Sequence, residues 1–142
     1  MTYFVKTYMD RTFPVIDLDS TVSTAARVIA EGKKEFALVI EKGIPMGIIS
    51  AMEIVSHVVA RAIDASKVKV REVMTPLVSV DPDDDLMKAS EIMLKSKQSR
   101  LAVVKAGIVY GVLTAQGIAE RCPEYIDKAM RDILKWHFPW KP

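Results

Sequence analysis

FALVIEKGIPMGIISAMEI, residues 36–54, decides the fold of this chain, because residues 100–118, RLAVVKAGIVYGVLTAQGI, repeat its pattern without a gap. Each copy begins with a short apolar run that is typical of a buried strand. A glycine follows where a two-residue hairpin loop needs a positive φ, and a second strand comes next. Ser50 or Thr114 then stands where a helix begins. The identical positions are Val39, Gly43, Ile44, Gly47, Ala51 and Ile54, which match Val103, Gly107, Ile108, Gly111, Ala115 and Ile118.

A helix is expected before each copy. Segments that begin at Met9 and Met74 resemble each other, and both lead into acidic residues that favour the start of a helix. We expect Gly32 to end the first of these helices. Residues 1–8 are expected to form a short strand or a lead-in. The apolar positions keep helical spacing at Val22, Ala25, Ala26 and Ile29, and again at Leu86, Ala89 and Met93.

The two halves are expected to differ after the hairpins. In the first half the helix should continue to about Ala62, whereas Pro123 should stop the corresponding helix of the second half. A final amphipathic helix is expected from Pro123 to about Trp136. The aromatic end, residues 136–140, is expected to pack on the body of the protein or on another chain. The apolar face expected for the first helix consists of Ile54, Val55, Val58, Val59 and Ala62.

Composition limits the possible partners and location. The 142 residues are half hydrophobic, which is enough for one ordinary core. The net charge is +2, from 20 basic and 18 acidic residues, so no strong field attracts nucleic acid or a membrane surface. A single cysteine, Cys122, fits a reducing compartment. No apolar run approaches the roughly 20 residues that a membrane helix needs, and the N-terminus lacks the core of a secretion signal. We therefore expect a soluble cytoplasmic protein.

The second half has the motif Met74-Thr75-Pro76 before Val80 and Pro82, followed by a helix and by the strands that end at Thr114. Together with the repeat, this motif resembles the CBS domain, named after cystathionine β-synthase. Residues 8–121 are similar to a tandem pair of such domains, a Bateman module. The resemblance implies a mixed α/β (α+β) fold of two β-α-β-β-α repeats packed with quasi-twofold symmetry. We expect a first CBS motif at residues 8–64, a second at 70–121, and a C-terminal helix and aromatic tail at 122–142.

The resemblance also implies a ligand. Such pairs commonly bind AMP, ADP, ATP or S-adenosylmethionine in clefts between their halves, regulate a partner protein, and often pair as dimers. In this sequence the favoured cleft is expected to comprise Ser50, Glu53, Thr75, Leu77, Val78, Ser99 and Arg100. A second, weaker cleft would comprise Phe13, Pro14, Val15, Lys34, Glu35, Phe36 and Thr114.

The favoured cleft has coherent chemistry. Glu53 could accept both hydroxyls of a ribose, and Arg100 offers a fixed positive fork to a phosphate. Ser50 opens a helix, whose first amides suit an anion. Apolar Leu77 and Val78 could flank the adenine. The sequence departs from the family in carrying Glu53 in place of aspartate, and the second motif, Thr114 to Gly117, lacks the acid altogether.

The same residues also have structural explanations. Ser50 and Glu53 have the spacing of a capping box, which satisfies helix-end amides without a ligand. Thr114 would cap a helix in either case, Arg100 could belong to a solvated basic face, and Thr75 with Pro76 could simply shape a turn.

Two functions stay open. The chain is either a stand-alone regulatory sensor of an adenine nucleotide, AMP before the others, as in energy sensing, or an interaction module whose clefts hold no ligand and which forms a homodimer. The identity of a regulated protein is unknown. No cofactor beyond the effector is expected. A metal site is not expected, since His57 and His137 lack a second ligand at metal-binding spacing. An enzyme is not expected either, because no histidine accompanies Cys122.

Overall fold

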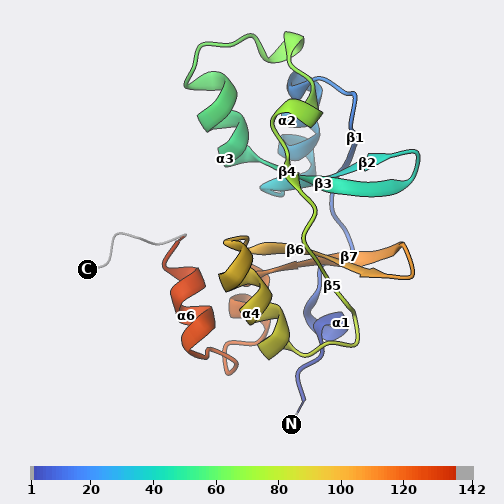
Figure 1. The fold of residues 1–142 in the computed structure, drawn as a ribbon. Helices are drawn as coiled ribbons and strands as arrows, with labels where there is room; N and C mark the ends of the chain where they lie inside the picture. Colours follow the sequence, from blue (N-terminus) through green and yellow to red (C-terminus); the bar gives the residue numbers. More distant parts are fainter. Residues whose placement is uncertain (1, 137–142) are drawn as a thin grey trace. The chain divides into compact units, whose positions relative to one another are not determined.

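The computed structural model describes residues 2–136 and contains two compact units. The first-repeat unit is Thr12–Leu77, and the second-repeat unit joins Met1–Arg11 to Val78–Pro142. Each unit has one sheet and its own apolar core (Figure 1). None of the helices within residues 2–136 has the length and the apolar character needed to cross a bilayer.

The first-repeat unit follows the order β-α-β-β-α that the sequence predicts. Its sheet has the order β1-β2-β3-β4, in which β1 runs parallel to β2 and the other pairs are antiparallel. Helices α2 and α3 contact each other on one side of this sheet (Figure 1). The elements are β1 (Val15–Asp17), α2 (Val22–Gly32), β2 (Phe36–Glu41), β3 (Ile44–Ser50), α3 (Ala51–Ile54), the π-helical η1 (Val55–Val59), the 3-10 helices η2 (Ala65–Lys67) and η3 (Val70–Glu72), and β4 (Thr75–Pro76).

The second-repeat unit has the same order and adds a helix at each end. Its sheet has the order β5-β6-β7, with β5 parallel to β6, and α4 packs against α6 (Figure 1). The elements are α1 (Val5–Tyr8), β5 (Ser79–Val80), α4 (Leu86–Ser96), β6 (Arg100–Lys105), β7 (Ile108–Thr114), α5 (Ala115–Arg121) and α6 (Lys128–Leu134). The prediction of two mixed α+β repeats is confirmed.

Local chemistry explains the hairpins and the helix starts. Lys42 and Gly43 have φ values of 50° and 79°, and Ala106 and Gly107 have 52° and 76°, so both predicted loops turn through two positive-φ residues. Thr21 caps α2 and Asp85 caps α4 by accepting hydrogen bonds from backbone amides. The acidic run before α4 therefore serves as a helix start, as predicted. On the predicted apolar faces of α2 and α4, all residues are buried except Ala26, which is half-buried.

The two similar segments at Met9 and Met74 occupy equivalent places in the two units. In the first-repeat unit Thr75 pairs with Ile48 along the edge of β3 opposite to β2. In the second-repeat unit Asp10 pairs with Val112 through hydrogen bonds of 2.8 and 2.9 Å. Residues 1–11 therefore complete the unit of the second repeat, although they precede the first repeat in the sequence.

A glycine in each hairpin permits this pairing. A Cβ atom on Gly47 would collide with the backbone oxygen of Thr75, and one on Gly111 would lie 2.6 Å from the backbone oxygen of Asp10. Only a residue without a side chain lets the two backbones approach this closely. The repeated glycines thus have a steric cause.

Several predicted boundaries are wrong. Residues 5–8 form the short helix α1, so of the two alternatives for the N-terminus the strand is wrong; the buried Val5 anchors this turn in the core of the second-repeat unit. The helix after β3 ends its regular hydrogen bonding at Val59 rather than at Ala62, which has a φ of 56°.

Two further expectations fail in part. Ile54 and Val58 are buried, but Val55 and Val59 of the predicted apolar face are 49% and 64% exposed. The final helix begins at Lys128 instead of Pro123, with Asp127 as its cap. Trp136 is 41% exposed, and the rest of the aromatic tail lies outside the described residues.

Replacing Gly47 by alanine should destabilise the protein by roughly 1–3 kcal/mol, since the new methyl group must displace backbone rather than a flexible side chain. Chemical denaturation of Gly47→Ala and of Gly111→Ala measures this loss. Met87→Ala is the matched control, because Met87 is 56% exposed and its truncation should cost less than about 0.5 kcal/mol. Glycine variants as stable as this control would contradict the steric explanation.

Candidate functional site

Glu53 is held at the start of α3 by a capping box. The backbone N–H of Ser50 donates to Glu53 Oε1 at 2.8 Å, and the backbone N–H of Glu53 donates to Ser50 Oγ at 3.2 Å. Ser50 is buried, and the β3 strand that ends at this residue fixes its position. Ser50 and Glu53 therefore form the capping box that their spacing predicts.

Thr75 holds the other oxygen of the same carboxylate. Its hydroxyl donates to Glu53 Oε2, and its backbone is fixed by the pairing of β4 with β3. Each carboxylate oxygen still has a second lone pair, so the cap leaves Glu53 able to accept hydrogen bonds from a ligand. Capping and ligand binding are thus compatible at this residue.

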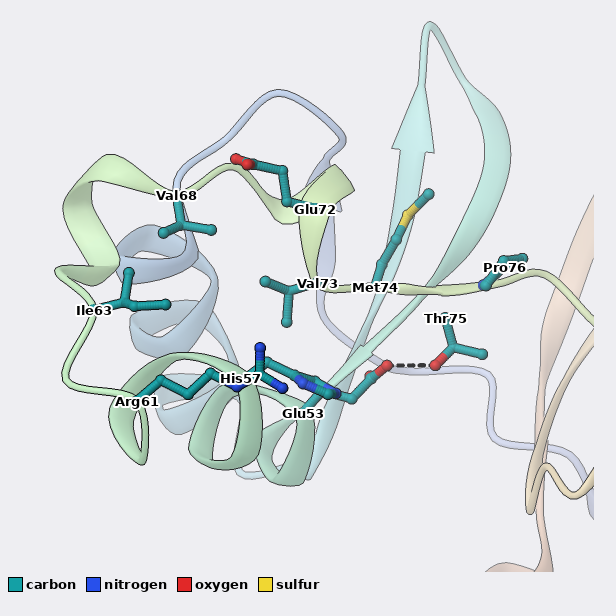
Figure 2. A pocket seen from close by; sticks show the side chains of 10 residues that line it. All are labelled: Glu53, His57, Arg61, Ile63, Val68, Glu72, Val73, Met74, Thr75 and Pro76. Carbon is teal, nitrogen blue, oxygen red and sulfur yellow. Dashed lines mark hydrogen bonds between the residues drawn. The ribbon is translucent and has the colours of Figure 1, made fainter.

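An open pocket of about 660 Å³ adjoins this carboxylate within the first-repeat unit. Figure 2 shows that Glu53, His57 and Arg61 lie along one wall, while the carboxylate of Glu72 points away from them. Glu53 and His57 belong to the α3–η1 segment, and Arg61 lies in the turn that follows Val59. The opposite wall is mainly apolar. The lining residues are Glu53, His57, Arg61, Ile63, Val68, Glu72, Val73, Met74, Thr75 and Pro76.

The pocket combines groups that suit a small polar molecule. A fixed carboxylate and a hydroxyl can bind sugar hydroxyls, a guanidinium can bind an anion, and Val73 with Met74 supplies apolar surface. Sequence reasoning did not assign His57 and Arg61 to a ligand site. The available indication for His57 was its spacing of four residues from Glu53, which places both on one face of a helix. Arg61 lies beyond the end of η1, so the spacing gave no such indication for it.

The remaining residues of the favoured cleft come from both units. Leu77 belongs to the first-repeat unit, where its N–H donates to the Met46 carbonyl at 3.2 Å. Val78 and Ser99 belong to the second-repeat unit, and Arg100 begins β6 there opposite Thr114. The grouping of these residues with Glu53 stays a prediction.

The weaker cleft is divided in the same way. Phe13 and Phe36 stack with ring centroids 6.5 Å apart in the first-repeat unit. The carbonyl of Pro14 accepts a hydrogen bond from Leu38, and Glu35 accepts one from Ala51. Val15 and Lys34 belong to the same unit, whereas Thr114 lies in the second-repeat unit. Its hydroxyl accepts a hydrogen bond from the N–H of Gly117 at 2.9 Å and caps α5 as predicted. The grouping of these residues also stays a prediction.

The lone thiol is in an environment that suppresses its reactivity. Cys122 is fully buried, and burial raises the pKa of its thiol, so the thiolate is scarce near neutral pH. A hydrogen bond with this thiol raises the pKa of Tyr8 to about 12. Within residues 2–136 there is also no group of three histidine, cysteine or acidic side chains able to hold a metal ion.

Known proteins share both the sequence pattern and the fold. The sequence model of the CBS domain matches the chain twice, at residues 5–60 and 70–124. A conserved CBS domain protein of unknown function from Thermoplasma acidophilum is 25% identical, has a TM-score of 0.83, and aligns over 97% of this chain and 78% of its own. A hexameric CBS-CP12 protein from bloom-forming cyanobacteria has the same fold, with 22% identity, a TM-score of 0.80, and coverage of 85% of this chain and 68% of its own.

A curated relative adds sequence similarity. An uncharacterized protein of Methanopyrus kandleri is 26% identical over 120 residues, which is 83% of this chain and 61% of that protein. The chain spans 45% to 61% of the length of the curated relatives that it matches. The repeat, the two units of equal topology and the double match lead to one conclusion. The chain belongs to the CBS domain family and contains two copies of the domain.

Proposed function

We propose that this chain is a regulatory CBS pair that binds an adenine nucleotide, with AMP favoured over ADP, ATP and S-adenosylmethionine. The observation that carries the proposal is the carboxylate of Glu53, which is oriented by Ser50 and Thr75 and lines an open pocket. Because both oxygens are fixed before a ligand arrives, little rotamer entropy is lost when ribose hydroxyls bind.

The other groups of the proposed site have complementary tasks. Ser50 and the amides that follow it lie at the start of α3, where an anion is favoured. We assign the phosphate to Arg100 and Ser99, and the faces of the adenine to Leu77 and Val78, as the family resemblance implies. Binding would bias the arrangement of the chain and so change its affinity for a regulated protein.

Addition of millimolar AMP should raise the midpoint of thermal unfolding, because a ligand that binds only the native state stabilises it by mass action, by about 2.7 kcal/mol at one hundred times its Kd. ADP, ATP and S-adenosylmethionine are tested in parallel. Glu53→Gln should lose most of the shift. Glutamine can still form the capping box, so the variant should unfold close to the wild type when no ligand is added.

Glu31→Gln is the matched control for this experiment. Glu31 is an exposed acid on α2, in the same unit, and is not among the residues that line the pocket. Its ligand-induced shift should equal that of the wild type. An equal loss of the shift in both variants would mean that net charge, rather than the position of Glu53, controls binding. If none of the four ligands raises the unfolding midpoint of the wild type, the proposal is overturned.

A second candidate function, self-association, is favoured by an exposed apolar stripe. Met52, Val55 and Val59 are 68%, 49% and 64% exposed, and their spacing of three and four residues puts them on one side of the α3–η1 segment. Exposed apolar patches of this kind mark interaction surfaces. The similar CBS-CP12 protein is hexameric. We propose that the stripe pairs two copies of this chain as a homodimer.

Val59→Asp should convert the dimer to a monomer, since a carboxylate at the centre of an apolar interface loses its hydration without gaining a partner. Light scattering coupled to size exclusion measures the mass. Ile108→Asp is the control, because Ile108 is similarly exposed, at 57%, but lies beside the hairpin loop of the second-repeat unit. A wild-type chain that is monomeric at about 100 μM, or a Val59→Asp variant that stays dimeric, would refute the pairing.

A further inference from the structure

The two units differ at the position of the proposed ligand-binding acid. The gapless alignment that matches residues 36–54 with 100–118 places Gly117 opposite Glu53 and, continued along the helix, Arg121 opposite His57. The strand pairing places Asp10 where the first-repeat unit has Thr75, because Asp10 pairs with Val112 as Thr75 pairs with Ile48. Three equivalent positions therefore carry different chemistry in the two repeats.

Arg121 connects α5 to the N-terminal segment. Its Nη1 donates to the Tyr8 carbonyl at 2.7 Å, and its Nη2 forms an ion pair with Asp10 Oδ1. The Asp10 side chain is only 15% exposed. The backbone of Asp10 also exchanges hydrogen bonds of 2.8 and 2.9 Å with that of Val112, so the segment that presents Asp10 is held at more than one point. The Arg121 side chain is 39% exposed, so the pair is held by these contacts and by the covered carboxylate of Asp10 rather than by burial of the guanidinium.

The guanidinium fills the space that a side chain at position 117 would need. A Cβ atom on Gly117 would lie 3.2 and 3.3 Å from the two terminal nitrogens of Arg121, and 2.9 Å from Thr114 Oγ1. In the first-repeat unit the equivalent space, between residue 53 and Thr75, holds the carboxylate of Glu53. A positive group in the second repeat thus stands where the first repeat has an acceptor.

We propose that the Arg121–Asp10 ion pair closes the second repeat to a nucleoside, so that each chain binds one adenine nucleotide, through Glu53. This inference rests on the proposed function. A ribose needs acceptors for its two hydroxyl protons, and the guanidinium has only donors. The Asp10 carboxylate is paired with this guanidinium, and its side chain is only 15% exposed, so little of it is open to a ligand. Gly117 is compatible with this pair, since a Cβ there would already crowd the guanidinium and a longer side chain would compete for its space.

Isothermal titration of the full chain with AMP, ADP, ATP and S-adenosylmethionine tests this inference. The expected result is one binding event per chain, which Glu53→Gln weakens at least tenfold. Two equivalent binding events would overturn the closure while leaving the proposed function intact. One event that survives Glu53→Gln but is lost in Arg121→Ala would place the ligand in the second repeat. It would overturn the closure and the assignment of the site to Glu53, while nucleotide binding itself would stand. The absence of binding by all four would overturn both the closure and the proposed function.

A gain-of-site variant provides the positive test. Gly117→Glu combined with Arg121→Ala restores the acid and removes the guanidinium, so the binding stoichiometry should rise from one to two. Arg131→Ala, which removes an exposed arginine of α6 in the same unit, should still bind one. Circular dichroism checks that the double variant is folded. If it unfolds, Gly117→Glu combined with Arg121→Gln is used in its place. A folded double variant that still binds one nucleotide would refute the role of Arg121.

Discussion

The close approach of a backbone segment to a hairpin glycine is the constraint on which both units depend. At Gly47 the approaching residue is Thr75, and at Gly111 it is Asp10, each paired with the strand edge beside the glycine. In the first-repeat unit this pairing adds β4 to the sheet, and in the second it is the bridge between Asp10 and Val112. In each unit it brings one polar side chain to the following helix. Without the glycine the segment could not come within hydrogen-bonding distance, and neither Glu53 nor Arg121 would have its partner. The geometry of the candidate site therefore follows from a steric feature of the hairpin.

One backbone arrangement supports two different local chemistries. Where the helix carries Glu53, the approaching segment supplies a hydroxyl, and the carboxylate keeps acceptor capacity for a ligand. Where the helix carries Gly117, the approaching segment supplies a carboxylate, which Arg121 neutralises. Because the residues change in a matched way, each unit satisfies its own polar groups. The repeats thus share one order of elements and differ in the polar groups that they place at the start of this helix.

The sequence predicted the repeated parts of the fold well because hairpins, helix caps and apolar faces are local. The loops at Gly43 and Gly107, the capping box of Ser50 and Glu53, and the stop at Pro123 were all foreseen for this reason. The N-terminal helix α1 was missed, since its stability comes from burial of Val5 against residues distant in sequence. The exposure of Val55 and Val59 was missed for a related reason: helical spacing identifies an apolar face, but it does not tell whether that face meets the core of its own unit.

The candidate site was predictable in part. Glu53 and Ser50 stood out by spacing, whereas the hydrogen bond from Thr75 depends on how β4 pairs with β3, which a single sequence does not specify. The same holds for Arg121: the alignment places it opposite His57, but its contact with Asp10 requires the N-terminal segment to join the second repeat. A missing acid at Gly117 suggests only a lost function when read alone. The ion pair of Arg121 with Asp10 explains the glycine, because the guanidinium lies next to the space that a side chain at position 117 would need.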